Sequence, residues 1–180
     1  MIILTKKLIL EYIDSEKIVI ENFVFKNVIK NFYYFRLGGK ALTWNMEKKT
    51  FENTSINETT PLMLEANGYA RIWSHEKVTT SNSVFCLLGQ SSSVQNKGFR
   101  LNYSPSIDIG FKGYLELGVE NLLNIPQEIN FLDVIGKIIF FDVSSSLNVD
   151  EMIDNYWIKI MRQRQIQQWS NADDETDLFE

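Results

Sequence analysis

The sequence is poor in cysteine and histidine. Its 180 residues include one cysteine, Cys86, and one histidine, His75. A disulfide within the chain is therefore impossible, and a zinc site of Cys and His would need more ligands than the chain contains. This shortage excludes the zinc-dependent base deaminases, which need H-x-E and P-C-x-x-C motifs. One Ser-His-Asp triad, built on His75, is formally possible, whereas Cys86 lies in the apolar run VFCLL and is predicted to be a buried, inert thiol.

Basic residues and long apolar runs are also scarce. The chain has 18 Lys and Arg against 23 Asp and Glu, a net charge of −5. No basic patch is dense enough to release counterions from nucleic acid or an anionic membrane. No apolar run approaches the roughly 18 residues of a spanning helix, and the N-terminus lacks the basic head and cleavage site of a secretory signal. We therefore expect a cytoplasmic protein with neither nucleic acid nor membrane as a partner.

What the sequence does contain is enough apolar material for a core, with 44% hydrophobic and 13% aromatic residues. Its length favours a single domain. Residues 5–15 predict a short helix, residues 17–25 and 28–37 predict strands, and the polar residues 50–60 predict a loop. From residue 61 to about 145, short apolar segments recur about every ten residues, which is typical of a β-barrel or sandwich.

The C-terminal residues follow a different pattern. Asn148 and Glu151 form an N-x-x-E capping box. Apolar residues then repeat along one helical stripe: Met152, Ile153, Tyr156, Trp157, Ile160 and Met161. We therefore divide the chain into a β-barrel domain at 1–147 and a C-terminal helix with an acidic tail at 148–180. This helix is expected to dock on the barrel or a neighbouring subunit, or to bind a protein partner.

A polar loop follows the apolar run at 84–88. Gly89, Gln90 and the three serines at 91–93 place hydroxyls and backbone N–H groups directly after a predicted strand. Loops of this kind often hold a phosphate. Phosphate sites usually add an arginine, however, and Gln90 and Gln95 are both neutral. The loop is therefore a candidate phosphate site without its expected charge.

Five segments, spanning roughly residues 1–145, resemble dCTP deaminases, a branch of the trimeric dUTPase superfamily. In YYFRLGG the match keeps an Arg-Leu-Gly sequence, and the polar loop is similar to the family's Gly-Arg-Ser-Ser loop. The segments are MIILTKKLILEYIDSEKIVIENF (1–23), YYFRLGG (33–39), LEANGYARIWSHEKVTTSNSVFCLLGQSSS (64–93), SIDIGFKGYLELGVEN (106–121) and INFLDVIGKIIFF (129–141).

The resemblance implies a mainly β fold, a distorted jelly-roll β-barrel with a short N-terminal helix and a C-terminal helix, assembled as a homotrimer with active sites between subunits. Family members deaminate dCTP to dUTP without zinc, and some cleave dUTP to dUMP. Water attack on the pyrimidine needs a general base, which in the family is a glutamate on a strand. No cofactor or bound metal is required, and magnesium would arrive with the nucleotide phosphates.

Residue by residue, the resemblance implies a loss of phosphate-binding charge. Ser91 and Ser92 match the loop serines, but Gln90 and Gln95 stand where the family has arginines. Glutamine can donate a hydrogen bond to phosphate, yet it lacks the charge and fork geometry of a guanidinium. At about 1.5–3 kcal/mol per charged contact, two such losses predict triphosphate binding weaker by several kcal/mol.

The proton-handling group is also missing. The family aspartate, which in dUTPases orients the attacking water and the deoxyribose, corresponds to Asp108, and the phenylalanine of the same segment to Phe111. The expected catalytic glutamate falls at Gly118, which has no side chain. Glu116 and Glu120 share its strand face, but their Cα atoms should lie about 6–7 Å away. That is too far for a base that must come within about 3 Å of its proton. A two-residue register slip would restore the geometry, but the gapless spacing out to Gly136 argues against one.

Weaker matches complete the candidate site. Gln163 corresponds to the family's closing C-terminal segment, without the glycine and proline that usually follow. Lys97, Arg100 and Lys112 lie near the loop in sequence and either attract a phosphate or are ordinary surface charges.

Three hypotheses follow. The first is a non-catalytic descendant of a dCTP deaminase that binds a pyrimidine nucleotide or has a regulatory role. The second is an active deaminase, or a dUTP diphosphatase using Asp108. The third is an interaction protein that works through its C-terminal helix and tail.

Overall fold

The computed structural model describes residues 1–145, so the predicted C-terminal helix, Gln163 and the boundary after residue 147 lie outside the described residues. Residues Met1–Val143 form one compact unit, which is mainly β as predicted. Its elements are β1 (Ile2–Ile3), α1 (Lys6–Asp14), β2 (Ile18–Ile20), η1 (Phe25–Asn27), β3 (Val28–Ile29), β4 (Phe32–Asn45), β5 (Thr50–Ser55), β6 (Leu62–Leu64), β7 (Tyr69–Thr80), β8 (Val84–Gln90), α2 (Ser92–Asn96), β9 (Phe99–Asn102), β10 (Ser106–Ile107), β11 (Lys112–Asn121), β12 (Gln127–Ile129) and β13 (Val134–Asp142).

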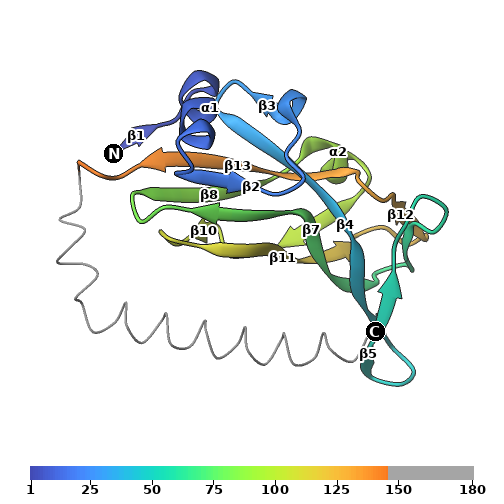
Figure 1. Cartoon of the computed structure of the whole chain (residues 1–180). Coiled ribbons are helices and arrows are strands. Elements are labelled where there is room, and N and C mark those ends of the chain that lie inside the picture. Colours follow the sequence, from blue (N-terminus) through green and yellow to red (C-terminus); the bar gives the residue numbers. More distant parts are fainter. Residues whose placement is uncertain (146–180) are drawn as a thin grey trace, which may run out of the picture. The chain divides into compact units, whose positions relative to one another are not determined.

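Most strands belong to one curled antiparallel sheet. Its main path runs β10-β8-β13-β4-β7-β11-β9, and β1, β2, β3 and β5 pair with members of that path. Strands β6 and β12 form a separate pair. The long strand β4 links the two halves of the sheet, because it pairs with β13 near its start and with β7 and β5 further along (Figure 1).

The core follows from strand alternation. Along β7, every second residue is buried, so one face of the strand meets the core and the other faces outward. The largest fully buried side chains include four aromatic rings, which fill the space inside the curl: Tyr33, Phe35, Phe99 and Phe140. Aromatic rings bury a large apolar area each, so they anchor the strands that carry the candidate site.

The prediction of a loop at residues 50–60 is wrong at its first half. Residues Thr50–Ser55 form β5, which pairs with β4, and this ladder places Trp44 opposite Phe51. Most residues of β5 are exposed or half-exposed, which fits the polar sequence TFENTS. Its order comes from the ladder with β4 and from the edge-to-face contact of Trp44 with Phe51, whose ring centroids are 5.0 Å apart.

Other boundaries differ in detail. Residues 5–15 contain α1 as predicted, but the strand expected at 17–25 is confined to β2. The apolar segments YARIW and KVTT form the single strand β7. The polar stretch after β8 contains the short helix α2 instead of remaining a loop.

A buried ion pair fastens β4 to β7. Glu76 is fully buried, and its carboxylate accepts hydrogen bonds from Arg36 Nε at 2.7 Å and Arg36 N at 2.9 Å. The hydroxyl of Tyr33 lies 3.4 Å from the same carboxylate. Burial, followed by the negative charge of Glu76, raises the pKa of Tyr33 well above its usual range. Arg36 therefore has a structural partner within the chain.

Candidate functional site

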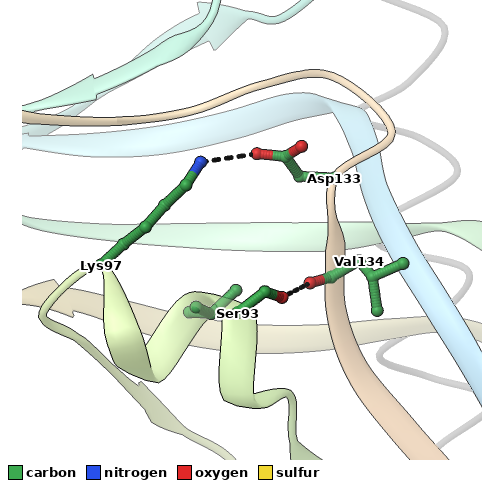
Figure 2. A pocket seen from close by; sticks show the side chains of 5 residues that line it. Ser93, Lys97, Asp133 and Val134 are labelled. Atoms are coloured by element: carbon green, nitrogen blue, oxygen red, sulfur yellow. Dashed lines mark hydrogen bonds and ion pairs between the residues drawn. The ribbon is translucent and has the colours of Figure 1, made fainter.

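The serines of the polar loop are bonded to strand β13. Ser91 is 3% exposed, and its hydroxyl donates to the carbonyl oxygen of Val134 at 2.8 Å. The Ser93 hydroxyl lies 3.0 Å from the same oxygen, as Figure 2 shows. Ser91 also caps α2 by accepting from the Val94 N–H. Ser92 and Ser93 are both exposed, and of the three serines Ser92 is the one whose side chain makes no hydrogen bond to any residue among 1–145.

Gln90 connects β8 to the edge strand β9. Its Nε2 donates to the Phe99 carbonyl at 2.7 Å, and its Oε1 accepts from the Leu101 N–H at 3.2 Å. The side-chain amide thus supplies hydrogen bonds that a neighbouring strand would otherwise make. At the position where the family resemblance implies a phosphate-binding arginine, the Gln90 side chain is hydrogen-bonded to backbone groups of β9. Gln95, at the other arginine position, is exposed on α2.

The cations around the loop are paired with carboxylates of the same chain. Lys97 Nζ lies 3.0 Å from Asp133 Oδ2 (Figure 2), and Arg100 Nη2 lies 2.5 Å from Glu120 Oε2. Lys112 is exposed and makes no ion pair with any residue of the described part of the chain. Two of the three candidate cations, Lys97 and Arg100, are therefore neutralised internally.

Gly118 is closely covered by an aromatic ring. A Cβ atom added at this glycine would lie 2.9 Å from the ring carbons of Tyr69 and closer still to the Tyr69 hydroxyl oxygen. Tyr69 in turn contacts Phe51, with ring centroids 6.2 Å apart. The position that the resemblance assigns to the general base is thus filled from β7. Sequence reasoning missed Tyr69, because only the register of β7 on β11 brings it there.

The two glutamates beside Gly118 lie on its strand face and are ion-paired. From Glu116 to Glu120 the register with β7 is unbroken, because the one register shift falls earlier, between Tyr114 and Glu116. Glu116 accepts from Arg71, whose Nη2 lies 2.5 Å from its Oε1, and Glu120 accepts from Arg100. Each of these two carboxylates therefore has an arginine partner within residues 1–145.

Asp108 and Phe111 lie at the turn between β10 and β11. Asp108 is exposed, and its side chain contacts no cation or donor within residues 1–145. Gly110 has a φ of +69°, a left-handed conformation that glycine adopts without strain. Phe111 packs against the core, and its N–H donates to Thr80 Oγ1 at 3.1 Å. Of these two candidates, Asp108 is the one presented to solvent.

The chain's one cysteine and one histidine each contact apolar side chains. Cys86 is buried as predicted, and burial raises the pKa of its thiol. The His75 ring meets Phe131 edge-on, with ring centroids 5.6 Å apart. Over residues 1–145, no group of three or more His, Cys, Asp or Glu side chains is arranged to hold a metal ion. The same residues include no helix long and apolar enough to cross a membrane.

The curled antiparallel sheet, with its polar segment after β8, has a dCTP deaminase-like fold. The model of the dCTP deaminase-like family matches residues 3–143, so the chain belongs to that family. The fold is similar to that of 2′-deoxycytidine 5′-triphosphate deaminase from Agrobacterium tumefaciens, with a TM-score of 0.64 and 16% identity. That match covers 77% of this chain and 47% of the deaminase, so the chain spans about half the length of that relative.

Two dUTPase structures also match, at lower TM-scores. The EIAV dUTPase is 13% identical with a TM-score of 0.41, and the match covers 62% of this chain and 86% of that chain. A dUTPase of Staphylococcus bacteriophage 80alpha is 16% identical with a TM-score of 0.40, and the match covers 48% of this chain and 68% of that chain. No curated protein matches the sequence. At these identities the structural likeness shows the fold alone.

Proposed function

We propose that the protein is a catalytically silent member of the dCTP deaminase-like family, a cytoplasmic homotrimer that binds a pyrimidine deoxynucleotide and has a regulatory role. The observation that carries the proposal is the Tyr69 side chain over Gly118, with its ring 2.9 Å from where a Cβ would lie. Deamination needs a group that moves protons at the attacked ring carbon, and a glycine beneath a tyrosine offers no carboxylate. Loss of general acid–base help typically costs about 10²–10⁴ in rate.

The neighbouring acids do not compensate for the missing glutamate. Glu116 and Glu120 accept hydrogen bonds from Arg71 and Arg100. A carboxylate that accepts charge-assisted hydrogen bonds from an arginine is held in place by those bonds. Either glutamate would have to leave its arginine and move along the strand to serve as a base.

Nucleotide binding is proposed to be weak, because two side chains of the polar loop already make hydrogen bonds within the chain. The Gln90 amide and the Ser91 hydroxyl already bond to backbone groups of β9 and β13, so a triphosphate would have to compete with those bonds. Ser92 and Gln95 remain exposed and available. Magnesium carried by the phosphates, together with cations from an adjoining protomer, would supply the missing positive charge.

The test combines calorimetry with a turnover assay on the full-length chain. We expect saturable binding of dCTP, dUTP or dTTP with magnesium, and no ammonia or dUTP from dCTP at high protein concentration. Turnover in proportion to protein concentration would refute catalytic silence. Absence of binding by every pyrimidine nucleotide would refute the nucleotide-binding role.

One observation favours a second candidate, a dUTP diphosphatase. Asp108 is solvent-exposed and holds no ion pair within residues 1–145, so it is available to orient a water molecule. If this activity exists, Asp108→Asn should abolish pyrophosphate release from dUTP while the assembly stays folded. Asp14→Asn, the same change at an exposed aspartate on α1, is the matched control and should leave that release unchanged.

A further inference from the structure

A small cavity opens between α2 and the start of β13. Its volume is about 230 Å³, and Figure 2 shows the lining side chains on both sides of it. Ser93, Val94 and Lys97 come from α2 and its C-terminal end, whereas Asp133 and Val134 come from the turn and strand opposite. The volume is below the roughly 300–1,000 Å³ of a drug-sized ligand site, so it suits only a small group.

The cavity contains one cation, which is turned toward a carboxylate of the same chain. Lys97 Nζ donates to Asp133 Oδ2 at 3.0 Å. A lysine ammonium has three donors, and Asp133 is its one acceptor within residues 1–145. The pair is partly open to solvent, with 40% of the Lys97 side chain and 36% of the Asp133 side chain exposed. An incoming anion could therefore reach the ammonium without unfolding the site.

The turn before β13 holds the Asp133 carboxylate in place. Asp133 Oδ2 also accepts from the Asn130 N–H at 3.0 Å, and the Asp133 N–H donates to the Asn130 carbonyl at 3.1 Å. Between them, Leu132 has a φ of +64°, a conformation that non-glycine residues rarely adopt. The carboxylate is thus fixed by its own backbone and does not depend on Lys97 for its position.

We propose that this cavity is a phosphate-binding site that Asp133 keeps occupied with a built-in anion. The carboxylate takes the place at Lys97 that a phosphate oxygen would take, and its negative charge repels a second anion. Because Asp133 is fixed by its turn, a phosphate group binds only when the Lys97 ammonium turns away from that carboxylate. The inference depends on the proposed function solely for the ligand class, because a nucleotide would present this same group.

Removing the charge of Asp133 tests the inference. Asp133→Asn keeps an oxygen that can accept from the Asn130 N–H, so the turn is preserved while Lys97 is released. Inorganic pyrophosphate is the probe, titrated by calorimetry into the full-length chain. We expect the Kd of Asp133→Asn to be at least about tenfold below that of wild type, the factor that corresponds to 1.4 kcal/mol. Adding Lys97→Met to this variant should return the affinity to the wild-type value.

Glu120→Gln is the matched control. It releases Arg100 from a carboxylate oxygen 2.5 Å away, and neither residue lines the cavity. This variant should not gain pyrophosphate affinity, whereas an equal gain would show that net charge alone is responsible and would overturn the inference. Unchanged affinity in Asp133→Asn, with its thermal unfolding intact, would also overturn it. Because the probe carries no nucleoside, failure of nucleotide binding or detection of turnover would refute the proposed function without affecting this result.

Discussion

At the scale of single residues, Tyr69 and Gly118 form a complementary pair. A side chain at position 118 would overlap the Tyr69 hydroxyl and ring, since the new Cβ would lie 2.9 Å from the ring carbons. We expect Gly118→Glu to lower the free energy of unfolding by about 1–3 kcal/mol through overpacking. Tyr69→Ala opens that space, so the double variant should be more stable than the sum of the two single changes predicts. Urea denaturation of the four proteins measures the coupling, and simple additivity would show that the ring does not fill the site.

Leu132 gives a second prediction for a single residue. Its φ of +64° brings Cβ close to the backbone, a strain of about 1–2 kcal/mol that glycine does not have. Leu132→Gly and Leu132→Ala remove the same side-chain contacts, but only the glycine variant relieves this strain. We expect the glycine variant to be the more stable of the two by about 1 kcal/mol, after the entropy of glycine in the unfolded chain is allowed for. Thermal unfolding of both variants measures the difference, and equal stability would contradict the assignment of strain.

At the scale of elements, a side-chain hydrogen bond ties helix α1 to strand β13. Tyr12 Oη donates to Asp142 Oδ2 at 2.5 Å. This bond, then burial, raises the pKa of Tyr12 to about 12 from its usual 10. Above pH 10 the unfolded chain therefore releases this proton first, so the contribution of the bond is present below pH 10 and is lost between about pH 10 and 12.

The corresponding variant is Tyr12→Phe. Its free energy of unfolding should fall less steeply with pH above 10 than that of wild type, with a residual slope from Tyr33, whose pKa is also raised by burial. Urea midpoints across this range measure the two slopes. Identical slopes would show that Tyr12 and Asp142 are not bonded in solution.

The same scale shows how far the sequence specifies this fold. The alternation of apolar and polar residues identifies YARIW and KVTT as strand segments. That both belong to one strand, β7, could not be predicted, because polar residues lie between them. Strand β5 was missed since its stability comes from pairing with β4, which leaves no local signal. The resemblance was sufficient to identify Gly118 as the residue at the general-base position, and Gln90 and Gln95 as the residues at the two arginine positions. The Tyr69 ring and the bonds of Gln90 to β9 could not, because both depend on strand register.

At the scale of the whole molecule, the distribution of charge makes a prediction about assembly. Lys97, Arg100 and Arg71 are each neutralised by a carboxylate of the same chain, so one protomer alone presents little net attraction to a triphosphate. If a nucleotide binds, we expect part of the additional positive charge to come from another copy. Nucleotide affinity should therefore depend on assembly, and a trimer should have a mass of about 63 kDa, three times 21.0 kDa.

Sedimentation and nucleotide titration at matched protein concentrations test this dependence. We expect dCTP affinity to fall at least about tenfold as dilution converts trimer to monomer, because loss of one charge-assisted contact costs about 1.5–3 kcal/mol. The dependence should also weaken at high salt, since screening shortens the range of the cations from the neighbouring copy. A monomer that binds dCTP as tightly as the trimer would place the phosphate contacts within a single chain. In that case the positive charge would come from a lysine or arginine of the same chain that has left its carboxylate partner, and not from a neighbouring copy.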